Sequence, residues 1–148
     1  MSRPKTIICD IDGTLVSHVT TPSHMFEDTT RIELLPGVKE KFDEWDSKCY
    51  KIILLTGRKE SMREQTVCQL RDLGIFYDQL IMGAGGGARV LINDLKPKEN
   101  HPDNPTAISI NLNRNEGLKN VNLWLFYSVP IKGIKRWKYT LTEVLLMK

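Results

Sequence analysis

Cys9-Asp10-Ile11-Asp12-Gly13-Thr14 is the stretch of this chain that decides the fold. It follows the β-branched run Thr6-Ile7-Ile8, which predicts a buried strand that stops where the glycine lets the backbone turn. Side chains alternate along a strand, so Asp10 and Asp12 are expected on one face. At the carboxyl end of a parallel strand, such side chains converge on a crevice where ligands bind. Two carboxylates this close favour a divalent metal with oxygen ligands, and the alternative is an ordinary Asp-Gly turn.

The composition limits the class of protein. A chain of 148 residues predicts one domain, and its polar start and short apolar runs predict neither a signal peptide nor a transmembrane segment. The three cysteines have no metal-type spacing, which suits a reducing compartment, so a cytoplasmic location is expected. The net charge is +3, and residues 130–148 carry five basic residues against one acidic residue. The carboxyl-terminal tail is therefore basic, while the rest of the chain is near neutral.

Apolar runs alternate with helical patterns along the chain. Strands are predicted at 5–9, 51–55, 79–82, 89–93 and 106–110, and helices from Pro36-Gly37 onward and over about 60–73. Val38, Phe42 and Trp45 share one face of the first helix. Strands that are apolar throughout and separated by helices favour a parallel sheet. The expected fold is α/β, a Rossmann-like doubly wound sheet of five parallel strands with helices on both faces.

Two more polar clusters follow predicted strands. Thr56-Gly57-Arg58 offers a hydroxyl and backbone N–H groups at a helix entrance, where an anion could bind. Asn93-Asp94 places another carboxylate at the same edge of the sheet, where it could complete a metal site with Asp10 and Asp12. Each cluster alone is more typical of a turn or a helix cap. Three strand ends that carry Asp-x-Asp, Thr and Asp together favour a site.

These motifs resemble those of the haloacid dehalogenase-like (HAD) superfamily of phosphohydrolases. Cys9 to Leu15 match its first motif, Asp-x-Asp-Gly-Thr, and Leu54 to Arg58 match its second, a Ser or Thr after the next core strand. The resemblance covers roughly residues 5–112. Of the two motifs, the first is the specific one.

The resemblance implies a role for each motif residue. Asp10 is expected to be the nucleophile that forms an aspartyl-phosphate, and Asp12 the acid that protonates the leaving oxygen and then the base that activates water. Thr56 and the N–H of Gly57 are expected to hold the phosphoryl group. Mg²⁺ is the expected cofactor, with the Asp10 carboxylate, the Asp12 backbone carbonyl and Asp94 as its ligands.

The third motif of the superfamily, a Lys or Arg ahead of the fourth strand, is only partly matched. That stretch reads Gly83-Ala84-Gly85-Gly86-Gly87-Ala88-Arg89, so Arg89 is the expected phosphate-binding cation and Lys59 or Lys96 are the alternatives. A solvated surface arginine is an equally good interpretation of Arg89. The glycine run is expected to be a flexible loop.

The sequence leaves no room for a cap domain. We expect a HAD-like core over residues 1–122, with a small flap at about 15–34, and an apolar and basic tail over 123–148. Docking of the tail on the core is favoured over recruitment of nucleic acid or an anionic surface, although the role of the tail stays open. A capless site is open to solvent, so a large substrate or a second subunit of a homo-oligomer would have to cover it.

The sequence as a whole predicts a Mg²⁺-dependent phosphomonoester hydrolase that works through an aspartyl-phosphate. The expected substrate is a small phosphorylated metabolite such as a phosphosugar. One alternative is a phosphatase that acts on nucleic-acid ends, favoured by the open site and the basic tail. The other is a catalytically silent binding module on the same fold, because a fold does not determine a function.

Overall fold

The computed structural model describes residues 4–18, 32–95 and 106–123. The chain divides into two compact units. One contains Arg3–Arg89 together with Asn113–Asn120, and the other includes Val90–Leu112. All the helices and strands described below belong to the first unit.

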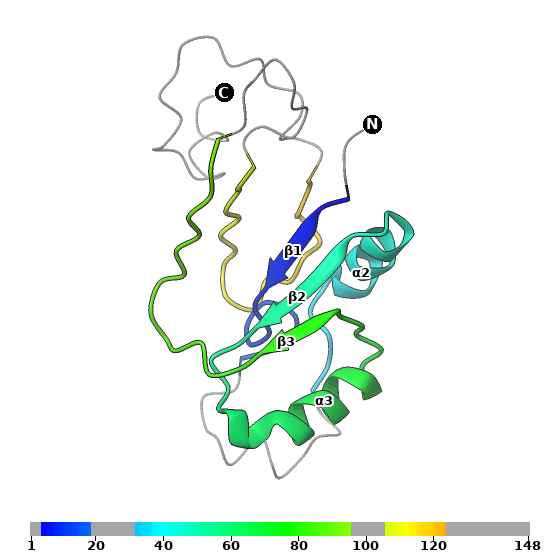
Figure 1. Ribbon diagram of the computed structural model, residues 1–148. Coiled ribbons are helices and arrows are strands. Elements are labelled where there is room, and N and C mark those ends of the chain that lie inside the picture. The colour runs from blue at the N-terminus through cyan, green and yellow to red at the C-terminus, as the bar shows by residue number, and fades with distance from the viewer. Residues whose placement is uncertain (1–3, 19–31, 96–105, 124–148) are drawn as a thin grey trace. The chain divides into compact units, whose positions relative to one another are not determined.

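The first unit is built on a parallel sheet in the order β1-β2-β3. Its strands are β1 (Thr6–Cys9), β2 (Lys51–Leu55) and β3 (Gln79–Ile81). Ile8 pairs with Ile53 between the first two strands, and Leu54 pairs with Leu80 between the last two. The three arrows in Figure 1 therefore run in the same direction. The predicted α/β class with a parallel sheet is confirmed, and the carboxyl ends of the strands share one edge.

Helices connect the strands, as predicted. Helix α2 (Val38–Ser47) joins β1 to β2, and the 3-10 turn η2 (Glu60–Met62) leads into helix α3 (Arg63–Asp72), which joins β2 to β3. Helix α2 buries its apolar stripe, with Phe42 and Trp45 rings 5.3 Å apart. Gly74 follows α3 in the left-handed conformation at φ +68°, which glycine adopts without steric cost.

The prediction of five strands is only partly matched. Among the described residues, neither 89–93 nor 106–110 forms a strand. Val90 is 80% exposed and Ile92 is 90% exposed, whereas a strand inside a parallel sheet buries both faces. Their apolar, β-branched composition is typical of strands, but a strand also needs a neighbour that accepts its backbone hydrogen bonds.

Two predicted features fall largely outside the described residues. These are the flap, expected at about 15–34, and the tail, expected over 123–148; Lys96 lies outside as well. In the ranges that the structure describes, no helix has the length and apolar character needed to span a membrane.

Candidate functional site

The turn after β1 carries Asp10 and Asp12 and is anchored in the core. Ile11 and Leu15 are fully buried, and the Leu15 N–H donates a hydrogen bond to the Ile11 carbonyl at 2.8 Å. Gly13 lies between them at φ +83°, in the left-handed region that favours glycine. The two carboxylates therefore stand on a fixed turn at the carboxyl edge of the sheet.

Asp10 is the accessible carboxylate of the pair, with 40% of its side chain exposed. Partial burial raises the pKa of the Asp10 carboxyl, and the nearby Asp12 charge acts in the same direction. A hydrogen bond from the Ile11 backbone and the Arg89 charge lower it. An accessible carboxylate of this kind can reach a phosphorus atom or a metal ion.

Asp12 is held by a buried arginine. Arg58 Nε donates a hydrogen bond to Asp12 Oδ2 at 2.9 Å, and Arg58 Nη2 donates to Asp12 Oδ1 at 2.7 Å. The side chain of Arg58 is only 5% exposed, compared with 21% for Asp12. This bidentate pair fixes the plane of the carboxylate. From the sequence, Arg58 is part of the Thr56-Gly57-Arg58 cluster, but no role was expected for its side chain.

Thr56 and Gly57 lie at the end of β2, as predicted. Thr56 is fully buried, and its Oγ1 accepts a hydrogen bond from the Arg58 N–H at 3.1 Å, while Gly57 is exposed. The start of the glycine run packs against this turn: the Gly83 N–H donates to the Arg58 carbonyl at 2.7 Å and the Ala84 N–H to the Thr56 carbonyl at 3.0 Å. Hydrogen bonds therefore anchor the amino-terminal part of the loop that was expected to be flexible.

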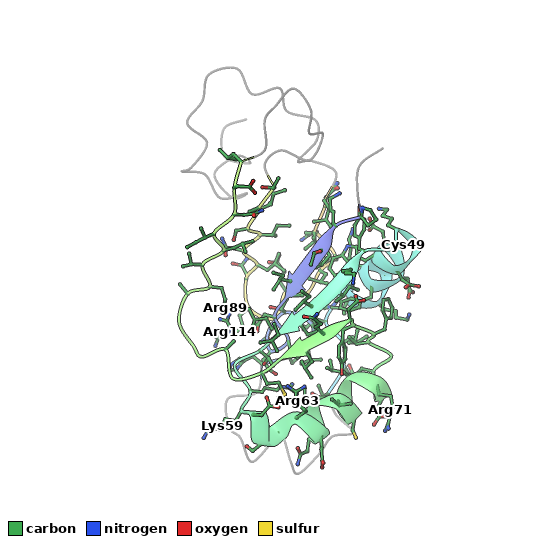
Figure 2. The ribbon with its side chains drawn as sticks, in the orientation of Figure 1. Cys49, Lys59, Arg63, Arg71, Arg89 and Arg114 are labelled. Carbon is green, nitrogen blue, oxygen red and sulfur yellow. The ribbon has the colours of Figure 1, made fainter. Side chains whose placement is uncertain are left out.

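Arg89 is brought to the site. Its Nη2 lies 3.8 Å from Asp10 Oδ1, and 43% of its side chain is exposed. Figure 2 shows Lys59, Arg89 and Arg114 toward the carboxyl ends of the strands, with Arg71 on the opposite side. Within the described residues, neither Lys59 nor Arg114 forms an ion pair. The site edge thus offers exposed positive charge to an anion.

Asp94 lies in the other compact unit, in the exposed stretch 90–95. Its backbone carbonyl accepts a hydrogen bond from Thr106 Oγ1 at 2.5 Å. In the described parts of the chain, no group of three or more His, Cys, Asp or Glu side chains is placed to hold a metal ion. Asp94 as a metal ligand therefore stays a prediction.

The first unit itself offers oxygen atoms that suit Mg²⁺. The Asp10 carboxylate is partly exposed, and the Asp12 carbonyl oxygen accepts no backbone hydrogen bond from the described residues. Both are the hard oxygen ligands that Mg²⁺ prefers. The Asp12 carboxylate is already engaged by Arg58, so the backbone carbonyl is the better candidate ligand at that residue.

A later segment packs on the turn, which the sequence analysis did not foresee. The Asn115 N–H donates to the Gly13 carbonyl at 2.8 Å, and Asn115 Oδ1 accepts from the His18 N–H at 2.8 Å. Arg114 approaches Gly13 so closely that a Cβ on that glycine would lie 3.0 Å from Arg114 Cγ. The only signal in the sequence is the turn-forming run from Asn113 to Gly117, which does not reveal its distant partner.

Comparison with known proteins agrees with this geometry. The family model of the polynucleotide kinase PNKP phosphatase domain matches residues 4–89. The chain belongs to this family. No curated protein and no solved structure matches the chain.

Membership of the polynucleotide kinase phosphatase family confirms the expected HAD-like superfamily and supports phosphohydrolase chemistry. The match includes six of the site residues in the first unit, namely Asp10, Asp12, Thr56, Gly57, Arg58 and Arg89. It ends before Asp94 and before the segment Asn113–Asn120. The family evidence therefore bears on the sheet and its carboxyl edge.

Proposed function

We propose that the protein is a Mg²⁺-dependent phosphomonoesterase that carries the phosphoryl group on Asp10. One observation carries the proposal: a partly exposed carboxylate stands beside a second carboxylate, Asp12, which a buried arginine holds at the ends of parallel strands. A module that only binds phosphate would favour cations here, because carboxylates repel phosphate. The family match supports the same reaction class.

The reaction has two steps. The Asp10 carboxylate attacks phosphorus, the ester P–O bond breaks, and Asp12 gives its proton to the leaving oxygen. Water then attacks the aspartyl-phosphate while Asp12 takes a proton from it, so that inorganic phosphate leaves and Asp10 is restored. When bound, Mg²⁺ would neutralise negative charge at the site, and this would let the Asp10 carboxylate and the phosphate approach each other.

Three groups are proposed to orient the phosphoryl oxygens. The exposed Gly57 backbone and the Arg89 guanidinium, which already faces Asp10, reach a phosphoryl group directly. Thr56 Oγ1 accepts a hydrogen bond from the Arg58 backbone, so its hydroxyl hydrogen can be donated to a phosphoryl oxygen. Because Thr56 is buried, this last contact requires the entering phosphate to displace the atoms that cover it.

A phosphate at a nucleic-acid end is the substrate class that we favour over a small metabolite. The matching family is named for polynucleotide kinase. The exposed cations Lys59 and Arg114 suit a substrate that carries further phosphates beyond the one removed. A metabolite with one phosphate would need only the groups around Asp10. The small metabolite expected from the sequence rested on neither of these observations.

A substrate panel tests the proposal. The full chain with Mg²⁺ is incubated with oligonucleotides that carry a 3′-phosphate or a 5′-phosphate, with a phosphosugar and with p-nitrophenyl phosphate, and phosphate release is measured. We expect the highest kcat/KM with one of the oligonucleotides and a loss of that advantage in high salt. A higher kcat/KM with the phosphosugar would favour a small phosphorylated metabolite as the substrate. No phosphate release from any ester would favour a catalytically silent binding module.

Charge variants refine the same test. Lys59→Gln and Arg114→Gln are expected to raise KM for the oligonucleotide more than for p-nitrophenyl phosphate, because each removes a contact to a phosphate beyond the reacting one. Arg71→Gln is the matched control, since Arg71 lies on the opposite side and pairs with Asp72. Equal effects of all three variants would argue against a substrate path across Lys59 and Arg114.

A further inference from the structure

Arg58 connects the turn after β1 to helix α3. On one side, its Nε and Nη2 hold the two oxygens of Asp12. On the other side, its Nη1 donates hydrogen bonds to Gln69 Oε1 at 2.6 Å and to Thr66 Oγ1 at 3.2 Å. The buried guanidinium therefore donates four hydrogen bonds, and two of its acceptors belong to a helix that the reaction itself does not use.

The two helix residues are suited to fix the guanidinium. Thr66 and Gln69 are three positions apart, so they lie on the same face of α3. Thr66 is 1% exposed, and the neighbouring Leu70 is fully buried, which anchors that face in the core. A guanidinium is planar, so acceptors that fix Nη1 also fix the directions of the other N–H groups.

We propose that Gln69 and Thr66 are positioning residues for Asp12 and act through Arg58. The inference rests on the proposed function, in which Asp12 transfers protons. Without the two acceptors, Arg58 keeps its charge but loses the hydrogen bonds that fix the orientation of its guanidinium. The Asp12 carboxylate, which is hydrogen-bonded to that guanidinium, can then rotate with it. Proton transfer depends steeply on such geometry, because a displacement of about 1 Å can cost roughly 10²-fold in rate.

The leaving group provides a specific readout. Phenyl phosphate and p-nitrophenyl phosphate have similar shapes, but phenolate needs a proton from Asp12 far more than the weakly basic nitrophenolate does. The kcat/KM value reports the steps up to phosphoryl transfer to Asp10, so it isolates the role of Asp12 as an acid. A defect in the acid should therefore appear mainly with phenyl phosphate, whereas general damage to the fold lowers both values equally.

Gln69→Leu and Thr66→Val remove the acceptors with little change in volume. We expect each to lower kcat/KM about tenfold with phenyl phosphate and about twofold with p-nitrophenyl phosphate, a part of the 10²–10⁴-fold that acid–base catalysis contributes. Thr66→Ser keeps the hydroxyl and should restore activity. Gln65→Leu is the matched control, because Gln65 is an exposed glutamine on the same helix. If Thr66→Val does not fold, the Gln69→Leu variant alone tests the inference, because Gln69 is partly exposed and its substitution disturbs the core less.

A second measurement does not depend on turnover. The buried Arg58 Nε–H should give an NMR resonance protected from solvent exchange, and Gln69→Leu should shift it and speed its exchange, while Gln65→Leu leaves it unchanged. Equal losses with the two esters, or an unchanged Arg58 resonance in Gln69→Leu, would overturn the inference alone. No hydrolysis of either ester by the unmodified protein would overturn the proposed function and this inference together.

Discussion

Replacing Gly117 by alanine should destabilise the protein far more than the same change at Gly74. Both glycines have positive φ, +76° and +68°, so each substitution costs about 1 kcal/mol for the backbone alone. A Cβ at Gly74 meets nothing within 4 Å, whereas a Cβ at Gly117 would lie 2.3 Å from the Pro36 carbonyl oxygen. That oxygen accepts a hydrogen bond from the Leu118 N–H at 2.8 Å. The clash would therefore disrupt the contact that holds the segment Asn113–Asn120 against Pro36.

The difference can be given a magnitude. If the segment moves away, the side chain of Leu118, now 2% exposed, loses its burial at a cost of about 2 kcal/mol. We therefore expect Gly117→Ala to lower the free energy of unfolding by about 3 kcal/mol and Gly74→Ala by about 1 kcal/mol. At this chain length, the corresponding falls in Tm are about 12 °C and about 4 °C.

Urea denaturation followed by circular dichroism measures both values under one condition. The same variants can be assayed with p-nitrophenyl phosphate, where Gly117→Ala should also lose activity, because Asn115 in that segment supports the turn after β1. Equal destabilisation by the two substitutions would refute the reasoning, since it would show that Gly117 is not packed against Pro36.

Other predictions concern the thiols, the metal and the tail. Burial raises the pKa of Cys9 to about 12, so at pH 8 only about one Cys9 thiol in 10⁴ is ionised. Alkylation should modify the exposed Cys49 and Cys68 quickly and Cys9 only when the protein unfolds. Equally fast alkylation of all three thiols would contradict this expectation. Asp94→Ala should raise the Mg²⁺ concentration for half-maximal rate at least about tenfold, and an unchanged titration would exclude Asp94 as a ligand. A chain that ends at Asn122 should lose stability or solubility, since buried apolar surface contributes about 25 cal/mol per Å²; an equally stable and active truncation would refute docking of the tail.

The local part of the fold could be predicted because neighbouring residues determine it. The unbroken apolar run of β2 and the helical spacing of Phe42 and Trp45 each indicate their element without knowledge of any partner. The turn at Gly13 follows in the same way, because a glycine after a strand and two aspartates leaves few backbone conformations. These features place Asp10 and Asp12 at the carboxyl edge of the sheet.

The remaining features depend on residues far apart in the sequence. Arg58 and Asp12 are separated by 46 positions, and no local pattern reveals which carboxylate a buried arginine will hold. The contact between Asn115 and His18 spans 97 positions. The apolar run around Val90 shows the converse case: its composition is typical of a strand, but strand formation depends on a neighbouring strand, which composition does not supply.

The most direct test of the central claim is the rate of phosphate release by the unmodified protein and by Asp10→Asn, with p-nitrophenyl phosphate and saturating Mg²⁺. Asparagine has the size of aspartate but lacks the charge that attacks phosphorus, so the variant should fold normally by circular dichroism. We expect Mg²⁺-dependent release by the unmodified protein and a fall of about 10⁴-fold or more in Asp10→Asn. A folded Asp10→Asn that keeps more than about a tenth of the rate would contradict it, because no aspartyl-phosphate could then lie on the main reaction path.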